Sequence, residues 1–362
     1  MAKPVTKKKA SPRDFFMHLT PGKLAGLRGV TDAGGRFKVL ALDQSNSFRK
    51  FIKAAMERQG KKGEASYDQV VHAKLEITEV LAPYASAVLL DVNYGARQAV
   101  NAFVVPRGVG LIVRVEASRD AGIAGEFEPG WSVAQIKKMG GTAVKLLVYM
   151  DVRDAKATKA QMSFVKRVAE DCQKEDILLM IEELSYPRKG EDKKTPAYVA
   201  RRPENIIKSA ELIGPYADIL KLEFPADIRN DSTETVQKNL AAVNAAAIRP
   251  WVLLSAGEKF EVFAKQVELA MKAGCSGTMA GRAIFQEYFD VNTPDEQKRF
   301  LEGTGIERMN QLNSIVDSYA LPWFERYRLS SKDFFAAVDP NWYFSGKIPK
   351  LKSKKTAVKG EY

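Results

Sequence analysis

The sequence contains few of the residues that bind metals or form disulfides. Only two histidines, His18 and His72, occur in 362 residues, so one chain cannot supply a three-histidine metal site. The two cysteines, Cys172 and Cys275, are too few for a disulfide framework and match no metal-ligand spacing. We therefore expect no metal and no cofactor, in a protein that works in a reducing compartment.

Long apolar runs are absent as well. No run approaches the roughly 20 residues of a membrane span, and the start of the chain, "MAKPVTKKKASPRDF", is not followed by the apolar segment of a signal peptide. A cytoplasmic location without a membrane partner is expected. No G-x-G-x-x-G turn follows the first expected strand, which argues against an open dinucleotide-binding sheet.

The net charge of +12 is concentrated at the two ends of the chain. Residues 1–13 contain five Lys or Arg and no acid, and residues 347–362 contain six lysines and one acid, which leaves +2 for residues 14–346. Such tails are usually solvated arms. Because neither interleaved aromatic residues nor a helix-turn-helix pattern accompanies them, the sequence does not favour a nucleic-acid partner.

Short apolar runs alternate with amphipathic segments along the chain. The eight runs are at 37–43, 86–91, 109–116, 142–149, 177–182, 217–223, 251–257 and 276–282, and the helical segments include 163–175 and 258–274, the latter closing on Gly274. Eight such units in about 250 residues predict a (β/α)8 TIM barrel. We expect a basic extension at 1–20, one barrel domain with additional C-terminal helices at 21–346, and a flexible basic tail at 347–362.

Charged and small residues gather at the C-terminal ends of these runs, where barrel enzymes build their active sites. They are Asp43, Asp91, Arg114, Glu116, Lys145, Glu182, Lys221, Glu223, Ser255, Gly257, Gly281 and Arg282. A single buried Lys–Glu pair would more often be structural. Polar groups at every strand end are hard to explain by packing, because burying charge costs free energy.

Lys221 lies inside an apolar strand, and alternation places it on one face with Ile219 and Glu223. A lysine that is buried beside a second cation gives up its proton more readily, and Lys145 is the candidate cation. Such a lysine can form a Schiff base with a carbonyl compound. Glu182 is the candidate general acid–base, with a salt bridge to one of the lysines as the alternative reading.

The last two strands predict an anion site. "LSAGEKF" and "AGRAIF" each end in a turn of small residues that opens a helix, where free N–H groups favour phosphate. Ser255, Gly257 and Gly281 provide the turns, and Arg282 adds a guanidinium. This is the usual position of a phosphate site in a barrel.

The segments "ALDQ", "LLDVNYG", "AVKLLVYMD", "DILKLEFP", "LSAGEKFEVF", "AGRAIF" and "ALPWFERY" together resemble the tagatose-1,6-bisphosphate aldolase family of class I aldolases. The resemblance implies that Lys221 forms the Schiff base, that Glu182 is the acid–base, and that Lys145 assists. It also implies phosphate binding at the Ser255–Gly257 and Gly281–Arg282 turns. The predicted substrate-binding residues are Asp43, Gln44, Asp91 and Tyr186.

One position departs from the family pattern, because Ser45 stands where relatives have the arginine of D-Q-R. Arg49 or Lys50 are candidates to replace that charge. The expected activity is cleavage of tagatose or fructose 1,6-bisphosphate to dihydroxyacetone phosphate and glyceraldehyde 3-phosphate by a homo-oligomer. The alternatives are a sulfofructose 1-phosphate aldolase that releases sulfolactaldehyde, and a barrel that has become a sugar-phosphate sensor.

Overall fold

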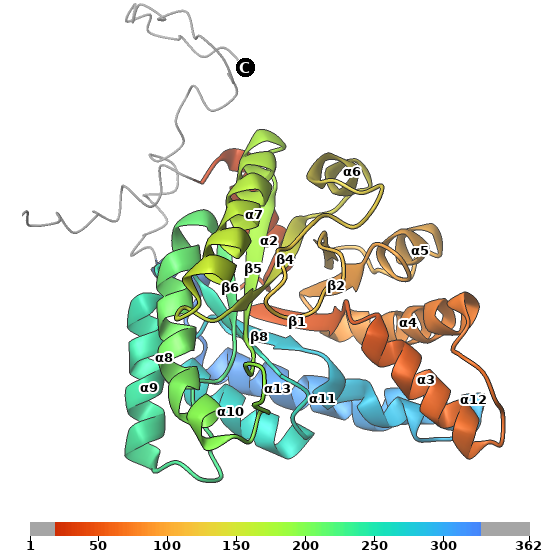
Figure 1. The fold of residues 1–362 in the computed structure, drawn as a ribbon. Coiled ribbons are helices and arrows are strands. Elements are labelled where there is room, and N and C mark those ends of the chain that lie inside the picture. The colour runs from red at the N-terminus through yellow and green to blue at the C-terminus, as the bar shows by residue number, and fades with distance from the viewer. Residues whose placement is uncertain (1–18, 327–362) are drawn as a thin grey trace, which may run out of the picture.

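The strands of the computed structural model, which describes residues 19–326, close into one parallel barrel (Figure 1). The strands follow one another around the barrel in sequence order, and β8 pairs with β1. Their bounds are β1 Phe37–Leu42, β2 Ala87–Asp91, β3 Gly110–Arg114, β4 Ala143–Met150, β5 Leu178–Ser185, β6 Ile219–Leu222, β7 Trp251–Leu254 and β8 Gly277–Ala280. The predicted barrel is confirmed, and every expected range overlaps its strand.

Helices alternate with the strands, as the amphipathic segments predicted. Their bounds are α2 Pro21–Val30, α3 Asn46–Arg58, α4 Tyr67–Leu81, α5 Ala96–Asn101, α6 Val133–Lys138, α7 Ala155–Lys174, α8 Pro196–Ile213, α9 Thr233–Ala246, α10 Phe260–Lys272, α11 Arg282–Phe285, α12 Pro294–Phe300, α13 Ile306–Tyr319 and α14 Trp323–Arg326. Local sequence sets several ends: Ser66 and Gln69 form a capping box before α4, and Gly274, with φ +101°, follows α10.

Two apolar layers result from the alternation of side chains along the strands. Val39 and Ile219 belong to the inner layer, and Leu40 and Leu220 belong to the layer between strands and helices. Lys221 therefore points into the barrel. The strand ends at Leu222, so the predicted common face does not extend to Glu223.

The strand register brings polar residues into one layer at the C-terminal ends. Asp91 pairs with Arg114 across β2 and β3, and Arg114 pairs with Lys145 across β3 and β4. Glu182 pairs with Lys221 across β5 and β6. Five polar side chains from different strands thus reach the same end of the barrel.

Helices α12, α13 and α14 follow the last strand, and α13 packs against α10. They confirm the predicted C-terminal helices as far as residue 326. Residues 327–346 and both basic tails lie outside the described range. No helix within residues 19–326 is long and apolar enough to cross a membrane.

Candidate active site

A cavity of about 260 Å³ opens at the C-terminal ends of the strands. Its wall contains most of the predicted site residues, although they come from six different strand ends. Those that line it are Asp43, Gln44, Lys145, Glu182, Lys221, Ser255, Gly281 and Arg282. The barrel therefore brings together residues that lie up to about 240 positions apart in the sequence.

Lys145 is the centre of a buried ion-pair network. Its Nζ lies 2.9 Å from Asp43 Oδ2, 2.9 Å from Glu116 Oε1 and 2.8 Å from Glu182 Oε2. Lys221 Nζ lies 3.0 Å from the same Oε2 of Glu182. Glu182 thus bridges the two lysines, and within residues 19–326 Lys221 pairs with one carboxylate whereas Lys145 pairs with three.

Burial and charge oppose each other in this network. Burial works to lower the pKa of Lys145, but the carboxylates of Asp43, Glu116 and Glu182 outweigh it and raise that pKa above its ordinary value. Burial works to raise the pKa of Asp43, but nearby cations, Lys145 foremost, outweigh it and lower that pKa. Lys145 is therefore a fixed cation, and a fixed ammonium cannot act as a nucleophile.

The β7 and β8 ends form the opposite part of the wall. Ala256 and Gly257 have φ values of +49° and +79°, so the turn after Ser255 has a left-handed backbone. A Cβ at Gly257 would lie 3.0 Å from Arg282 Cζ, so the missing side chain makes room for the guanidinium. Burial lowers the pKa of Arg282, opposed by the charges of Glu182 and Asp43.

Gly281 allows a close approach between β8 and the end of β1. A Cβ there would lie 2.9 Å from the carbonyl oxygen of Ala41 and 3.2 Å from Gln44 Nε2. The Gln44 side chain consequently reaches the β8 end. Its Oε1 is buried and accepts no hydrogen bond from the described residues, so it is available to a substrate hydroxyl.

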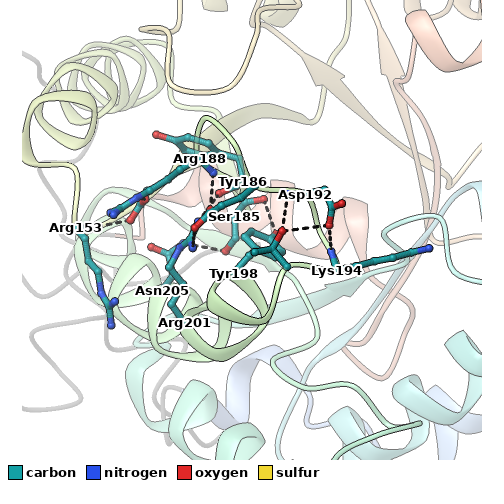
Figure 2. A network of polar contacts seen from close by, with 12 residues as sticks. Arg153, Ser185, Tyr186, Arg188, Asp192, Lys194, Tyr198, Arg201 and Asn205 are labelled. Carbon is teal, nitrogen blue, oxygen red and sulfur yellow. Dashed lines mark hydrogen bonds and ion pairs between the residues drawn. The ribbon is translucent and has the colours of Figure 1, made fainter.

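Three predicted site residues do not line the cavity. Gly257 lines an adjacent depression with Arg282. Asp91 is fully buried behind the cavity. Its carboxylate pairs with Lys74 and accepts hydrogen bonds from Ser45 Oγ at 3.3 Å and Tyr94 N at 2.9 Å. Tyr186 lines a neighbouring depression with Arg188 (Figure 2), and its ring contacts that of Tyr149 at 6.3 Å between centroids.

Two further residues line the cavity and a third lies behind it with Asp91, although no role followed from the sequence. Arg114 and Glu116 line the cavity, and the polar end of the third apolar run was their only signal. Lys74 is completely buried. Its signal was its position on the apolar stripe of α4 with Val70 and Ile77.

Arg114 occupies the place beside Ser45. Its Nη1 donates to the carbonyl oxygen of Asp43 at 2.9 Å, and its Nη2 donates to Ser45 Oγ at 3.3 Å. Its Nε is buried and donates to no described residue. Arg49 and Lys50 are exposed on α3 and do not line the cavity.

The structure is thus a closed (β/α)8 barrel with a buried lysine–carboxylate cluster at the C-terminal ends of its strands. Residues 38–287 match the family described as DeoC/LacD family aldolase. The chain belongs to this family and is an aldolase. No cluster of three or more His, Cys, Asp or Glu within residues 19–326 could hold a metal ion.

Relatives of known name agree with the family. Tagatose 1,6-diphosphate aldolase of Listeria monocytogenes serotype 4a is 29% identical over 335 residues, covering 86% of this chain and 96% of the relative. Tagatose 1,6-diphosphate aldolase 1 of Streptococcus pyogenes serotype M3 is 28% identical over 334 residues, covering 86% and 100%.

Solved structures share the fold. An archaeal fructose 1,6-bisphosphate aldolase superposes with a TM-score of 0.53 at 17% identity, covering 81% of this chain and 98% of its own. Fructose-bisphosphate aldolase of Plasmodium falciparum superposes with a TM-score of 0.61 at 14% identity, covering 86% and 97%.

Proposed function

We propose that this protein is a class I aldolase that cleaves a ketose 1,6-bisphosphate, tagatose or fructose 1,6-bisphosphate, through a Schiff base on Lys221. The difference between the two buried lysines carries the proposal. Three carboxylates hold Lys145 as an ammonium, whereas Lys221, which lines the cavity, pairs with Glu182 alone among the described residues. The names of the relatives support this substrate class. An archaeal structure with the same fold has its catalytic Lys covalently bound to the carbinolamine intermediate.

The reaction follows from the shared carboxylate. Glu182 accepts a proton from the Lys221 ammonium, and the free amine adds to the C2 ketone to give a carbinolamine. Protonated Glu182 returns its proton to the C2 hydroxyl, which leaves as water, and an iminium ion remains. Glu182 then removes the C4 hydroxyl proton, the C3–C4 bond breaks, and its electron pair moves into the iminium to form an enamine. After the aldehyde leaves, protonation at C3 and hydrolysis release dihydroxyacetone phosphate and free Lys221.

Lys145 keeps this centre electrically balanced. Asp43, Glu116 and Glu182 carry three negative charges, and Lys145, Lys221 and Arg114 carry three positive charges when Lys221 is protonated. Lys145 keeps its 2.8 Å contact with Glu182 Oε2 while the substrate hydroxyl replaces Lys221 as the proton donor. Asp43, held ionised by Lys145, can accept a hydrogen bond from a substrate hydroxyl.

The two phosphates are assigned to opposite ends of the cavity. The one-phosphate is placed at Ser255, Gly257, Gly281 and Arg282, because Arg282 makes no ion pair with the residues that the structure describes. The other end of the substrate reaches the start of α3, where Asn46 and Ser47 line the cavity and the Ser45 side chain does not cap the helix. Arg114 supplies the charge there, with its Nε free to donate.

Reductive trapping tests the Schiff base. Borohydride reduction in the presence of dihydroxyacetone phosphate, followed by peptide mass spectrometry, is expected to give an adduct on Lys221. A Lys221→Met protein is expected to give none, and a Lys145→Met protein, which retains the amine of Lys221, is expected to give the adduct more slowly. An adduct on Lys145 with Lys221 unmodified would reverse the assignment.

A further inference from the structure

Two buried carboxyl groups lie just outside the cavity, on the strands that carry the proposed catalytic pair. Glu183 follows Glu182 in β5, is fully buried, and points to the opposite face of the strand. Glu223 follows the end of β6, two residues after Lys221, and is 4% exposed. Neither lines the cavity, so the proposed chemistry uses neither.

Ser185 connects the two carboxyl groups. Its backbone N–H donates to Glu223 Oε2 at 2.8 Å, and its hydroxyl donates to Glu183 Oε1 at 2.9 Å. Figure 2 shows Ser185 against two residues of α8: Asn205 Nδ2 donates to Ser185 Oγ at 2.8 Å, and the Tyr198 hydroxyl donates to the Ser185 carbonyl oxygen at 3.2 Å. The end of β5, the segment after β6 and helix α8 thus meet at one serine.

The surroundings favour a proton on Glu183. Its Oε2 is buried and accepts no hydrogen bond within the described residues, and an ionised carboxylate with a bare buried oxygen is costly. Burial, with the charge of Glu223 second, raises the pKa of Glu183 well above its ordinary value. Burial also raises the pKa of Glu223, but Arg202 and the Ser185 N–H oppose that effect. The charged or titratable groups around the pair are Glu182, Lys193, Tyr198 and Arg202.

We propose that Glu183 and Glu223 are positioning residues: Glu183 carries a proton, and the pair, through Ser185, keeps Glu182 within reach of Lys221. The inference rests on the proposed function. While Glu183 is neutral, the ends of β5 and β6 stay together, and Glu182 Oε2 lies 3.0 Å from Lys221 Nζ. When Glu183 ionises, two carboxylates repel each other without solvent, and the strand ends move apart.

The pH dependence of kcat and KM tests the proposal on wild-type protein, Glu183→Gln, Glu183→Ala and Glu211→Gln. Glutamine has the shape of the neutral acid, and Glu211 is an exposed glutamate of α8 that serves as the control. We expect wild-type kcat to fall at alkaline pH by roughly tenfold relative to Glu183→Gln, because small misplacements of reacting groups have such effects. Glu183→Ala should lower kcat at every pH with little change in KM.

Two results would overturn the positioning role. One is an alkaline loss in Glu183→Gln that matches that of the wild type, and the other is a Glu183→Ala protein whose kcat equals that of Glu183→Gln. Glu211→Gln is expected to follow the wild-type profile, since it leaves the buried pair unchanged.

Unfolding measurements separate this inference from the proposed function. The unfolded chain releases the Glu183 proton above the ordinary value of 4.5, while the folded protein keeps it to higher pH. The free energy of unfolding of the wild type therefore decreases as the pH rises from 4.5 through the raised pKa of Glu183. Glu183→Gln has no proton to release at this position, so its free energy of unfolding lacks this contribution to the decrease. Identical pH dependence of unfolding in both proteins would overturn the proton on Glu183. If wild-type protein gives no Lys221 adduct, the proposed function fails, and the unfolding comparison still decides whether Glu183 holds a proton.

Discussion

The two sides of the cavity carry charge in different ways. On one side, the charge-paired half, Asp43, Glu116 and Glu182 contact Lys145, and Glu182 also contacts Lys221. On the other side, the glycine half, Arg282 lies beside the turns of Ser255, Gly257 and Gly281. It forms no ion pair with any residue between 19 and 326.

The difference indicates that the two halves have different roles. A network with balanced charges can move a proton between close partners without creating a net charge in a buried site. A guanidinium without a protein counter-ion is instead suited to an anion brought by the substrate. Substitutions in the two halves should therefore have different effects, and a result in which both halves respond alike would break the comparison.

The largest effect is expected from removing the nucleophile of the charge-paired half. Lys221→Met should lower kcat by about 10⁴-fold or more, because no other amine of the site can form the imine. Steady-state kinetics with fructose and tagatose 1,6-bisphosphates measure the loss. Lys298→Met, at an exposed position of α12, is the matched control. Retention of a tenth of the activity would show that the reaction does not depend on a lysine imine at this position.

The next largest effect is expected in the glycine half. Arg282→Gln should raise KM by about 10- to 100-fold, the equivalent of a lost charge-assisted hydrogen bond of about 1.5–3 kcal/mol. The change in kcat should be smaller, since Arg282 does not contact the proposed imine. Competition by inorganic phosphate should weaken in parallel. The exposed Arg299→Gln is the control, and an unchanged KM for Arg282→Gln would remove the anion assignment.

A smaller effect is expected at the far end of the substrate, where Ser45 replaces an arginine. Wild-type enzyme should prefer fructose 1,6-bisphosphate over fructose 1-phosphate by less than a hundredfold, or about 2.7 kcal/mol. Arg114→Gln should reduce that preference further, whereas Arg49→Gln should not, because Arg49 is exposed and lies outside the cavity. Values of kcat/KM for both substrates and for 6-sulfofructose 1-phosphate provide the test.

Two results would change this reading of the far end. If Arg49→Gln alone lost the preference for the bisphosphate, the cation that binds the far end of the substrate would be Arg49 on α3 and not Arg114. A preference for the sulfonate above a hundredfold would favour the sulfofructose 1-phosphate alternative, because the three substrates differ only at this end.

No effect is expected from chelation. Asp43, Glu116 and Glu182 are all occupied by Lys145, and the chain has only two histidines, so the charge-paired half should work without a metal ion. Incubation with EDTA should leave the rate unchanged. Inactivation by EDTA that added zinc reverses would contradict the lysine mechanism.

Much of the fold could be predicted because its signals are local. The apolar run at 251–257 contains β7, and the segment at 258–274 contains α10, since side-chain periodicity follows from the backbone geometry of each element. Gly274 could be assigned to a helix end for the same reason. The exact ends of the strands could be predicted less well. The predicted run at 217–223 extends one residue beyond Leu222, where the strand ends.

The site could be predicted only as a set of candidates. Polar ends of apolar runs identified Lys145, Glu182 and Lys221 as residues of the cavity wall. The same rule selected Asp91, whose carboxylate faces Lys74 instead. Position along the strand is the same in each case, and only the neighbouring element determines whether a side chain meets solvent or a buried partner.

By itself, the sequence determined the alternation of strands and helices, the layer in which charges lie, and the small residues at the last two turns, because these depend on spacing along one stretch of chain. The tertiary structure alone decided which charges meet. Lys145 receives carboxylates from the ends of β1, β3 and β5, and Glu223 turns away from Lys221 to Ser185. Barrel closure and strand register set these contacts between distant segments, and no local pattern records them.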